Sequence, residues 1–293
     1  MKKIICLVLS VLMLALCITA CGKKNSDFVA MDATDLLKED FGIAVQKGNA
    51  ELLAAVNKVV DEWVADGTMT AYVDYYTDLA DYEAGKEGVE KPDAGELATT
   101  WDFGDATETI AVYTESGFAP FEFISNGDVI GVDIAIMSQV AVNMGKKLDV
   151  KDVAFDTIPT CVEQATGDAV GAAGMTITDE RKETVDFSNI YYSSTLVIVS
   201  AKDVAIESVK ALDGLKVAVQ EGTSGDLIIS EAAGDGYKYV NEDEEEVVVS
   251  VGGDTTVARY KQYALALEDL KSGRVDAILM DKLPALTMLA VAK

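Results

Sequence analysis

Histidine is absent from the 293-residue sequence. This absence excludes the Ser-His-Asp and Cys-His arrangements of nucleophilic catalysis, acid–base catalysis by imidazole, and most zinc sites. An enzyme built from this chain would have to use Asp or Glu as its acid and base. We therefore expect neither a metal site nor a cofactor.

Cysteine is scarce, and three of the four cysteines lie within the first 21 residues. Only Cys161 lies in the rest of the chain, so no disulfide framework is expected. The sequence TCVEQA around Cys161 is typical of a helix. A lone cysteine in a helix is usually a small buried hydrophobic residue.

Positive charge is also scarce, with 24 Lys and Arg against 50 Asp and Glu and a net charge of −26. Removal of residues 1–20 would take away two lysines and no acid, which changes the net charge to −28. An acidic surface repels phosphate backbones and anionic lipid headgroups. We expect no binding to nucleic acid and no basic patch that holds a membrane.

The first 21 residues, MKKIICLVLSVLMLALCITAC, have the pattern of a secretory signal peptide. Two lysines precede an apolar run from Ile4 to Ala20, and small residues lead into Cys21. The sequence ITAC resembles a bacterial lipobox, which implies cleavage after residue 20 and a lipid on Cys21. The protein would then be lipid-anchored on the extracytoplasmic face of the cell membrane. An uncleaved anchor helix is the alternative, although the run is at the short limit for a membrane span.

The remaining chain is large enough for one large or two medium domains, because 49% of the sequence is hydrophobic. From residue 109 onward apolar strands alternate with helices in two cycles. This order predicts parallel βαβ units and an α/β fold with two lobes. We expect strands at 109–114, 148–155, 168–174, 194–201, 215–220 and 275–280, and helices at 131–145, 157–167, 178–188, 226–233, 256–273 and 282–292.

Three further segments have their own patterns. The sequence FGIAV at 41–45 predicts a strand, and the apolar spacing of residues 50–66 predicts an amphipathic helix that ends at Gly67. Residues 81–108 have no sustained period and are interpreted as a linker or surface loop. The acidic run NEDEEE at 241–246 is interpreted as a solvated loop; a cation site is the alternative, but the run lacks the spacing of a calcium loop.

Four motifs follow one another in the order found in a known family. They are GFAPFEF with GDVIGVDIAIM, AAGMTITDERKETVDFS, LKVAVQEGTSG and LKSGRVDAILMD. Residues 109–282 thereby resemble the polar amino-acid-binding proteins of ABC importers, solute-binding protein family 3. The resemblance implies a two-lobed periplasmic-binding-protein fold of type II that closes on a free amino acid and is not an enzyme. It also implies a monomer that docks on a membrane permease.

Arg181 follows a predicted strand end and lies in the first turn of a helix. A guanidinium there can bind a carboxylate through two hydrogen bonds, and the helix dipole adds a favourable field. The resemblance assigns Arg181 to the α-carboxylate of the ligand. The alternative is a surface ion pair with Asp179 or Glu183.

Asp281 follows the buried strand VDAILM, where open α/β sheets bind their ligands. The resemblance assigns it to the α-ammonium group; a helix cap is the alternative. It also implies that Gly174 presents a carbonyl and Thr176 a hydroxyl to the ligand.

The turn QEGTSG at 220–225 can hold an anion with its free N–H groups. It is not a nucleotide loop, because no Lys-Ser/Thr pair completes it. The resemblance assigns Thr223 or Ser224 to the ligand carboxylate and Gln220 to the pocket for the ligand's side chain.

Two aromatic residues and one acid complete the expected site. The resemblance places Phe118 and Phe155 on either side of the ligand's side chain, although each is also compatible with an ordinary core position. Glu115 would contact the tip of the ligand's side chain, which favours a basic or amide-bearing amino acid.

The order of the segments differs from the family. Residues 27–80 resemble the family's C-terminal ending, but here they come first, which implies a circular permutation. The expected first lobe is 42–196, with the linker 81–108 joining the old termini. The expected second lobe is 197–293 plus 27–41. The hinge strands would be STLVIVSA and DFGIAVQ, with helix 50–66 packed on the first lobe.

Two other functions remain open. Some dehydratases resemble this fold, so an enzyme could use Glu115 and Asp281 as an acid–base pair. A ligand-sensing receptor module is the other alternative, and it would need a partner that carries the signal.

Overall fold

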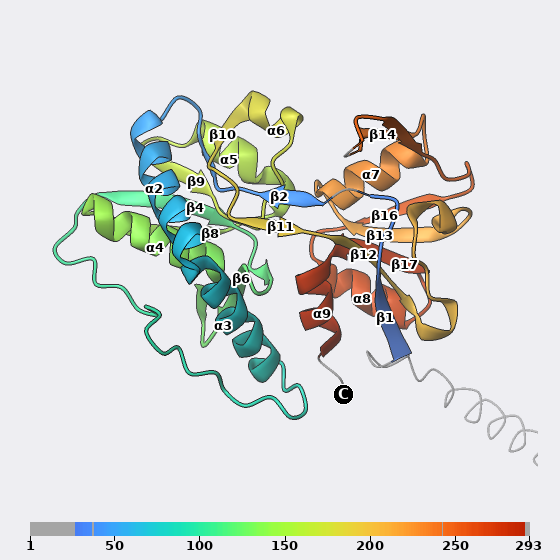
Figure 1. Cartoon of the computed structure of the whole chain (residues 1–293), viewed down its shortest axis with the longest axis horizontal. Helices are drawn as coiled ribbons and strands as arrows, with labels where there is room; N and C mark the ends of the chain where they lie inside the picture. Colours follow the sequence, from blue (N-terminus) through green and yellow to red (C-terminus); the bar gives the residue numbers. More distant parts are fainter. Residues whose placement is uncertain (1–26, 37, 242, 291–293) are drawn as a thin grey trace, which may run out of the picture.

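The computed structural model describes residues 27–36, 38–241 and 243–290. These residues form two lobes, each built around a five-stranded sheet, with two short strands running between them (Figure 1). The signal peptide predicted at residues 1–20 and the lipidation site predicted at Cys21 lie outside the described residues. Within the described part of the chain, no helix is both long and apolar enough to cross a membrane.

The sheet of the first lobe has the strand order β10-β3-β9-β4-β8. Strand β4 lies between β9 and β8 and runs parallel to both, as the alternation of strands and helices predicts, whereas β3 runs antiparallel to β9 and β10. The strands are β3 (Ala44–Gln46), β4 (Thr109–Thr114), β8 (Lys147–Asp152), β9 (Ala169–Gly171) and β10 (Val185–Phe187).

Helices and one small sheet complete the first lobe. The helices are α2 (Ala50–Asp66), α3 (Thr68–Glu83), α4 (Val132–Met144), α5 (Ile158–Gln164), α6 (Asp179–Thr184) and the 3₁₀ turn η2 (Phe155–Thr157). The small sheet contains β5 (Gly117–Phe118), β6 (Glu122–Ser125) and β7 (Asp128–Ile130). Cys161 lies half-buried in α5.

Helix α2 packs against α4 of the first lobe, with its apolar face buried. Asn49 caps the helix by accepting a hydrogen bond from the N–H of Leu52, and its Nδ2 atom donates to Asp168, which immediately precedes β9. The N-terminal segment is thereby attached to the sheet that contains β4.

A second helix, α3, follows α2 at once, and the sequence analysis did not predict it. Gly67 ends α2 in the left-handed conformation, with φ of 85°, as expected. The chain then turns and continues as α3, so residues 81–83 of the predicted linker are helical. Residues 84–108 form no helix or strand and lead back to β4 (Figure 1).

The sheet of the second lobe has the strand order β1-β12-β17-β13-β16. Its strands are β1 (Phe28–Asp32), β12 (Leu196–Ala201), β13 (Lys216–Gln220), β16 (Thr256–Tyr260) and β17 (Ala277–Asp281). It is accompanied by the helices α7 (Ser224–Ala232), α8 (Tyr263–Lys271) and α9 (Lys282–Ala290), and by the 3₁₀ turns η3 (Lys202–Val204) and η4 (Val209–Leu212).

The prediction of a single helix at 256–273 is wrong. Residues 256–260 form β16, which pairs with β13 in parallel, and the helix begins only at Tyr263. Val257 lies opposite Val217 in this pair, and β-branched residues favour strands. Residues 256–260 therefore form a strand of the sheet, although their apolar spacing is also compatible with a helix.

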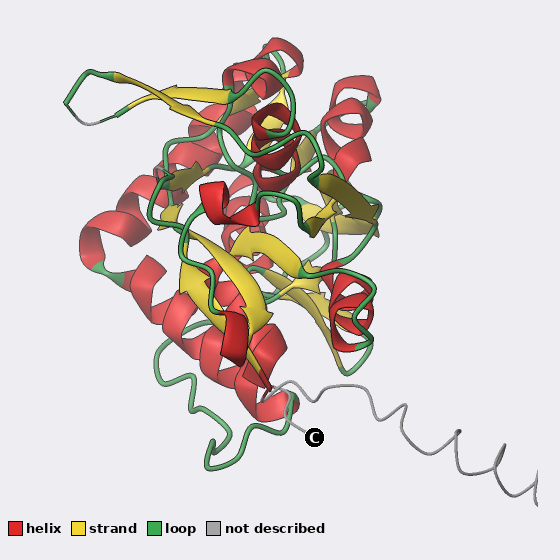
Figure 2. Cartoon of the chain, turned by 90° about the vertical axis from the view of Figure 1, so that its right-hand side faces the viewer, coloured by secondary structure: helices red, strands yellow, loops and turns green. Residues whose placement is uncertain are grey.

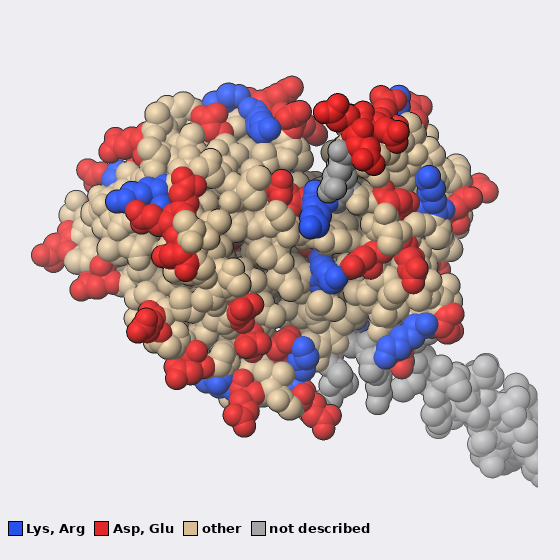
Figure 3. Space-filling view, in the orientation of Figure 1, with Lys and Arg blue, Asp and Glu red and all other residues tan. Residues whose placement is uncertain are grey.

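Residues 243–246 of the acidic run lie at the end of a hairpin between β14 (Tyr237–Val240) and β15 (Glu246–Val249), which stands out from the second lobe (Figure 2). Residues 243–246 are exposed, as expected for a solvated loop. Acidic side chains gather there and are spread over the rest of the same face (Figure 3). Among the described residues, no group of three or more acidic or cysteine side chains could hold a metal ion.

The two strands that cross between the lobes are β2 (Glu39–Phe41) and β11 (Tyr192–Ser194), which pair with each other in antiparallel fashion. The predicted hinge strands at 40–46 and 194–201 each combined a crossing strand with a strand of the adjoining sheet. The structure instead places β3 in the first sheet and β12 in the second. Short breaks at 42–43 and at 195 separate the crossing strands from the sheets.

Candidate functional site

The ten residues predicted from the sequence to contact a ligand line a single cavity between the lobes. Six come from the first lobe and four from the second. They are Glu115, Phe118, Phe155, Gly174, Thr176, Arg181, Gln220, Thr223, Ser224 and Asp281.

The lobes are closed over this cavity, which has room for about one water molecule (about 10 Å³). Glu115 of the first lobe accepts hydrogen bonds from the side-chain amides of Gln220 and Gln262 of the second lobe, both over 2.9 Å. At the rim, Lys261 forms an ion pair with Asp156 over 3.0 Å. These contacts join the two lobes beside the cavity.

Arg181 is held at the junction of the lobes. Its Nη1 atom donates to the carbonyl of Thr176 over 2.6 Å, and its Nη2 atom donates to the carbonyl of Gly222 over 2.9 Å. The guanidinium lies over the ring of Phe155, 5.3 Å from its centroid. Among the described residues it forms no ion pair, because Asp179 pairs with Lys182 instead. The alternative of a surface ion pair is therefore not what the structure shows.

Asp281 ends β17 and is buried on the second-lobe side of the cavity. Its Oδ1 atom has no hydrogen-bond partner among the described residues. Burial raises the pKa of Asp281 well above its usual range, and the neighbouring carboxylate of Glu39 raises it further, whereas Arg181 acts in the opposite direction. A cationic group in the cavity would stabilise the ionised form of this carboxylate.

Gly174 is required where it stands, because its φ is +53° and a Cβ atom would lie 2.6 Å from Cε1 of Phe118. The Phe118 ring stacks on Tyr263 of the second lobe, with the ring centroids 6.3 Å apart. The aromatic wall of the cavity therefore includes Tyr263 behind Phe118, and the sequence analysis did not identify this residue.

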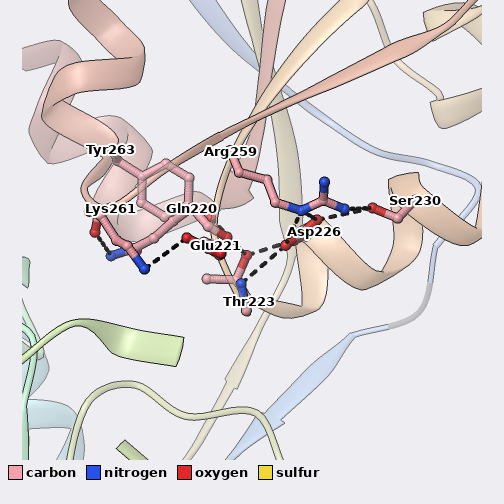
Figure 4. Close-up of polar contacts among 9 residues, drawn as sticks. Gln220, Glu221, Thr223, Asp226, Ser230, Arg259, Lys261 and Tyr263 are labelled. Atoms are coloured by element: carbon pink, nitrogen blue, oxygen red, sulfur yellow. Dashed lines mark hydrogen bonds and ion pairs between the residues drawn. The ribbon is translucent and has the colours of Figure 1, made fainter. Parts of the chain in front are cut away.

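The turn at 220–225 is held by the side chains of Thr223 and of Asp226, which follows the turn (Figure 4). Asp226 accepts from the N–H of Gly222 and from Arg259, and Thr223 caps α7 by accepting from the N–H of Asp226. The hydroxyl of Thr223 donates to the carbonyl of Gln220 over 2.8 Å. In the described structure the N–H groups of Ser224 and Gly225 donate to no acceptor, as is usual at the start of a helix.

Glu115 is buried, and burial raises its pKa although the amides of Gln220 and Gln262 act to lower it. Its two oxygens face the second lobe through these amides. Gln262, which directly precedes α8, was not identified from the sequence because that region was predicted to be one continuous helix.

Glu39 is a further residue that the sequence analysis missed. It lies on the crossing strand β2 and is 8% exposed. Burial raises its pKa, whereas hydrogen bonds from Ser224 and Thr176 and the charge of Arg181 act to lower it. Glu39 directly precedes the hinge strand predicted at 40–46, and the structure extends the crossing strand back to this residue.

The fold and the cavity together define a two-lobed binding protein, with two crossing strands as its hinge and charged side chains from both lobes at the cavity. Residues 110–265 match the family model of bacterial extracellular solute-binding proteins, family 3. The chain belongs to this family.

Named relatives are similar over part of their length. The arginine-binding extracellular protein ArtP of Bacillus subtilis is 37% identical over 110 residues, which are 38% of this chain and 43% of ArtP. A probable histidine-binding protein of Neisseria gonorrhoeae is 28% identical over 58% of each chain. This chain therefore spans about half the length of these relatives.

Solved structures show the same likeness. An ancestral arginine-binding protein bound to arginine has a TM-score of 0.52 and 35% identity, covering 61% of this chain and 72% of that one. Holo ArgBP from T. maritima has a TM-score of 0.51 and 32% identity, covering 61% and 71%. These comparisons confirm the predicted resemblance and the two-lobed α/β fold. The relatives are binding proteins, in agreement with the prediction that the chain is not an enzyme.

Proposed function

We propose that the protein binds a polar amino acid between its two lobes and delivers it to an ABC permease in the membrane. The observation that carries this proposal is the presence of Arg181 and Asp281, from opposite lobes, at one closed cavity. Their charges match the α-carboxylate and the α-ammonium of an amino acid. Binding therefore requires both lobes, and closure brings the two charges together.

The roles follow from which groups remain available. Arg181 and the N–H groups of Ser224 and Gly225 at the start of α7 would hold the carboxylate. The unpaired oxygen of Asp281 and the carbonyl of Gly174 would accept from the ammonium group.

The charges favour a basic amino acid. Three carboxyl groups, those of Glu39, Glu115 and Asp281, are buried at or behind the cavity, and Arg181 lines it as a cation. A ligand with a net positive charge offsets this excess of acid. Phe118 and Phe155 would enclose its side chain, and Glu115 with Gln220 would bind the tip. The arginine- and histidine-binding activities in the names of the relatives support the same class.

A thermal-shift screen against the twenty common amino acids tests this function. A ligand that binds only the folded protein raises its melting temperature, by an amount that grows with ligand concentration. We expect arginine or another basic amino acid to give the largest increase, and calorimetry should then give one site per chain. The proposal fails if no amino acid changes the melting temperature at millimolar concentration.

The remaining parts of the prediction are proposed with the same function. Cys21 would carry the lipid that anchors the protein outside the cytoplasm, and the protein would act as a monomer. The family's description as extracellular supports this location. Mass spectrometry of the protein purified from its host membrane would show a diacylglycerol on Cys21 if the anchor is present.

We also propose that the chain is circularly permuted, with the first lobe at 42–196 and the second at 197–293 plus 27–41. In support, residues 28–32 pair with β12 of the second sheet, whereas residues 44–46 pair with β9 and β10 of the first. Residues 84–108, the part of the predicted linker at 81–108 that forms no helix or strand, lead from α3 to β4. They would connect the positions of the old termini, both of which lie on the first lobe.

A further inference from the structure

Glu39 connects the two lobes behind the cavity. Its Oε2 atom accepts a hydrogen bond from the hydroxyl of Thr176 over 3.0 Å and another from the hydroxyl of Ser224 over 2.5 Å. Thr176 belongs to the first lobe and Ser224 begins α7 of the second. One carboxyl oxygen on the hinge strand is thus shared by two hydroxyls from opposite lobes.

Glu39 does not line the cavity, although both of its partners do. Together with Thr176 and Ser224 it lines a separate depression on the other side of these hydroxyls. The order from the cavity outward is therefore hydroxyl first and carboxyl second. Glu39 can influence a ligand in the cavity through the hydroxyls that it binds.

The segment that carries Thr176 runs beside β2. The N–H of Ile177 donates to the carbonyl of Asp40 over 2.8 Å, and the N–H of Gly42 donates to the carbonyl of Met175 over 3.1 Å. These backbone bonds fix Thr176 next to the hinge strand, so its contact with Glu39 does not depend on one flexible side chain alone.

A hydroxyl has one proton to donate and two lone pairs that accept. Thr176 and Ser224 both give their single proton to Glu39, and Oε2 accepts whether or not the other carboxyl oxygen is protonated. Each hydroxyl can then only accept toward the cavity. Neither can donate to a ligand carboxylate.

We propose that Glu39 is a specificity-determining positioning residue, which makes Thr176 and Ser224 acceptors and so selects a ligand group rich in donors at this end of the cavity. This inference rests on the proposed amino-acid site and identifies the group as the α-ammonium. The unpaired oxygen of Asp281 adds a third acceptor. The ligand carboxylate is left to Arg181 and the N–H groups of α7, which fixes the ligand's orientation.

The test is the variant Glu39→Met, with L-arginine and 5-guanidinopentanoate as probes, because the second compound is arginine without its α-amino group. Methionine offers these hydroxyls no carboxyl acceptor, so each can turn its proton toward the cavity. Calorimetry with wild type should show a strong preference for arginine. The ratio that we compare is the dissociation constant of 5-guanidinopentanoate divided by that of arginine. In the variant we expect this ratio to fall by roughly 10-fold or more, which is the value of a hydrogen bond to a charged group.

A general structural effect of the substitution would weaken the binding of both compounds equally and leave the ratio unchanged. Loss of the positioning role would lower the ratio. Glu39→Gln is the second variant, and it should keep a ratio close to that of wild type, because its amide oxygen can replace Oε2 as the acceptor for both hydroxyls. Glu87→Gln removes an exposed acid and is the control for charge alone. L-histidine and L-glutamine, each with its desamino analogue, replace arginine if one of them binds more tightly.

Two negative results have different meanings. If wild type binds none of the twenty common amino acids, the proposed function fails, and this inference fails with it. If wild type binds one of them and folded Glu39→Met keeps the wild-type ratio, the role of Glu39 is wrong while the amino-acid site stands.

Discussion

The backbone N–H of Gly174 donates a hydrogen bond to Oδ2 of Asp133 over 2.9 Å, and this bond attaches the wall of the cavity to helix α4. The other carboxyl oxygen of Asp133 accepts from the hydroxyl of Tyr191 over 2.6 Å. Tyr191 directly precedes the crossing strand β11. One buried carboxyl therefore connects the start of α4 with both the site and the hinge.

This connection predicts a pH dependence of stability. Burial raises the pKa of Asp133 to about 7, although the bonds from Tyr191 and Gly174 act to lower it. A carboxyl whose pKa is higher in the folded than in the unfolded protein adds stability at low pH and loses it as pH rises through the folded value. We expect the unfolding free energy of wild type minus that of Asp133→Asn to fall from pH 5 to pH 7 and to stay level above pH 8. Urea titrations at each pH measure this difference; a difference that rises with pH would contradict the prediction.

Arg181→Ala should abolish amino-acid binding. The change removes the charged group assigned to the ligand carboxylate and leaves that carboxylate without its two-pronged partner, at a cost of about 2–5 kcal/mol, or more than roughly 30-fold in affinity. Lys182→Ala is the matched control, because Lys182 is the next residue and pairs with the exposed Asp179. Calorimetry against the common amino acids measures the affinities of both variants and of wild type. Normal binding by the Arg181 variant would refute the assignment.

Much of this site could be predicted because its residues lie at the ends of strands and the starts of helices, which can be recognised in the sequence. Asp281 ends a buried strand, Arg181 follows the cap Thr178, and Thr223 and Ser224 begin a helix. The parallel order of the strands then brings such ends to one edge. The resemblance to a known family supplied the roles.

What the sequence analysis missed depends on contacts between distant segments. Glu39 reaches Thr176 across 137 positions of sequence, and only the register of β2 beside residues 175–177 places it there. Helix α3 was missed because a left-handed glycine normally ends a helical segment, whereas here Gly67 is followed directly by a second helix.

Glu115→Gln should change which amino acid is preferred. Glu115 accepts from two amides, and a neutral amide in its place removes a negative charge from the pocket assigned to the tip of the ligand's side chain. We expect the affinity for arginine to fall by roughly 10-fold or more, while that for glutamine changes less. Dissociation constants for both amino acids provide the test, with the exposed Glu87→Gln as control. Equal changes for the two ligands would place Glu115 outside the specificity pocket.

Gly174→Ala should destabilise the fold as well as narrow the cavity. An alanine at φ of +53° is strained, and its Cβ would collide with Phe118, so we expect a loss of about 2–4 kcal/mol. Gly167→Ala is the matched control, because Gly167 also has a positive φ, +88°, but a Cβ there meets nothing within 4 Å. That variant should lose only about 1 kcal/mol. Chemical denaturation measures both, and equal losses would mean that Phe118 moves aside without cost.

The proposed permutation predicts that moving residues 27–83, which end with α3, to follow residue 293 leaves a protein that folds and binds the same amino acid. The strands β1, β2 and β3 take their places by pairing with β12, β11 and β9, and these pairs need no particular order of the chain. Rearrangement is tolerated where few contacts cross the new cut. We expect the dissociation constant to stay within about threefold of the original. A rearranged chain that is unfolded by circular dichroism would argue that the present order of segments is required, and the permutation proposal would then lose its main support.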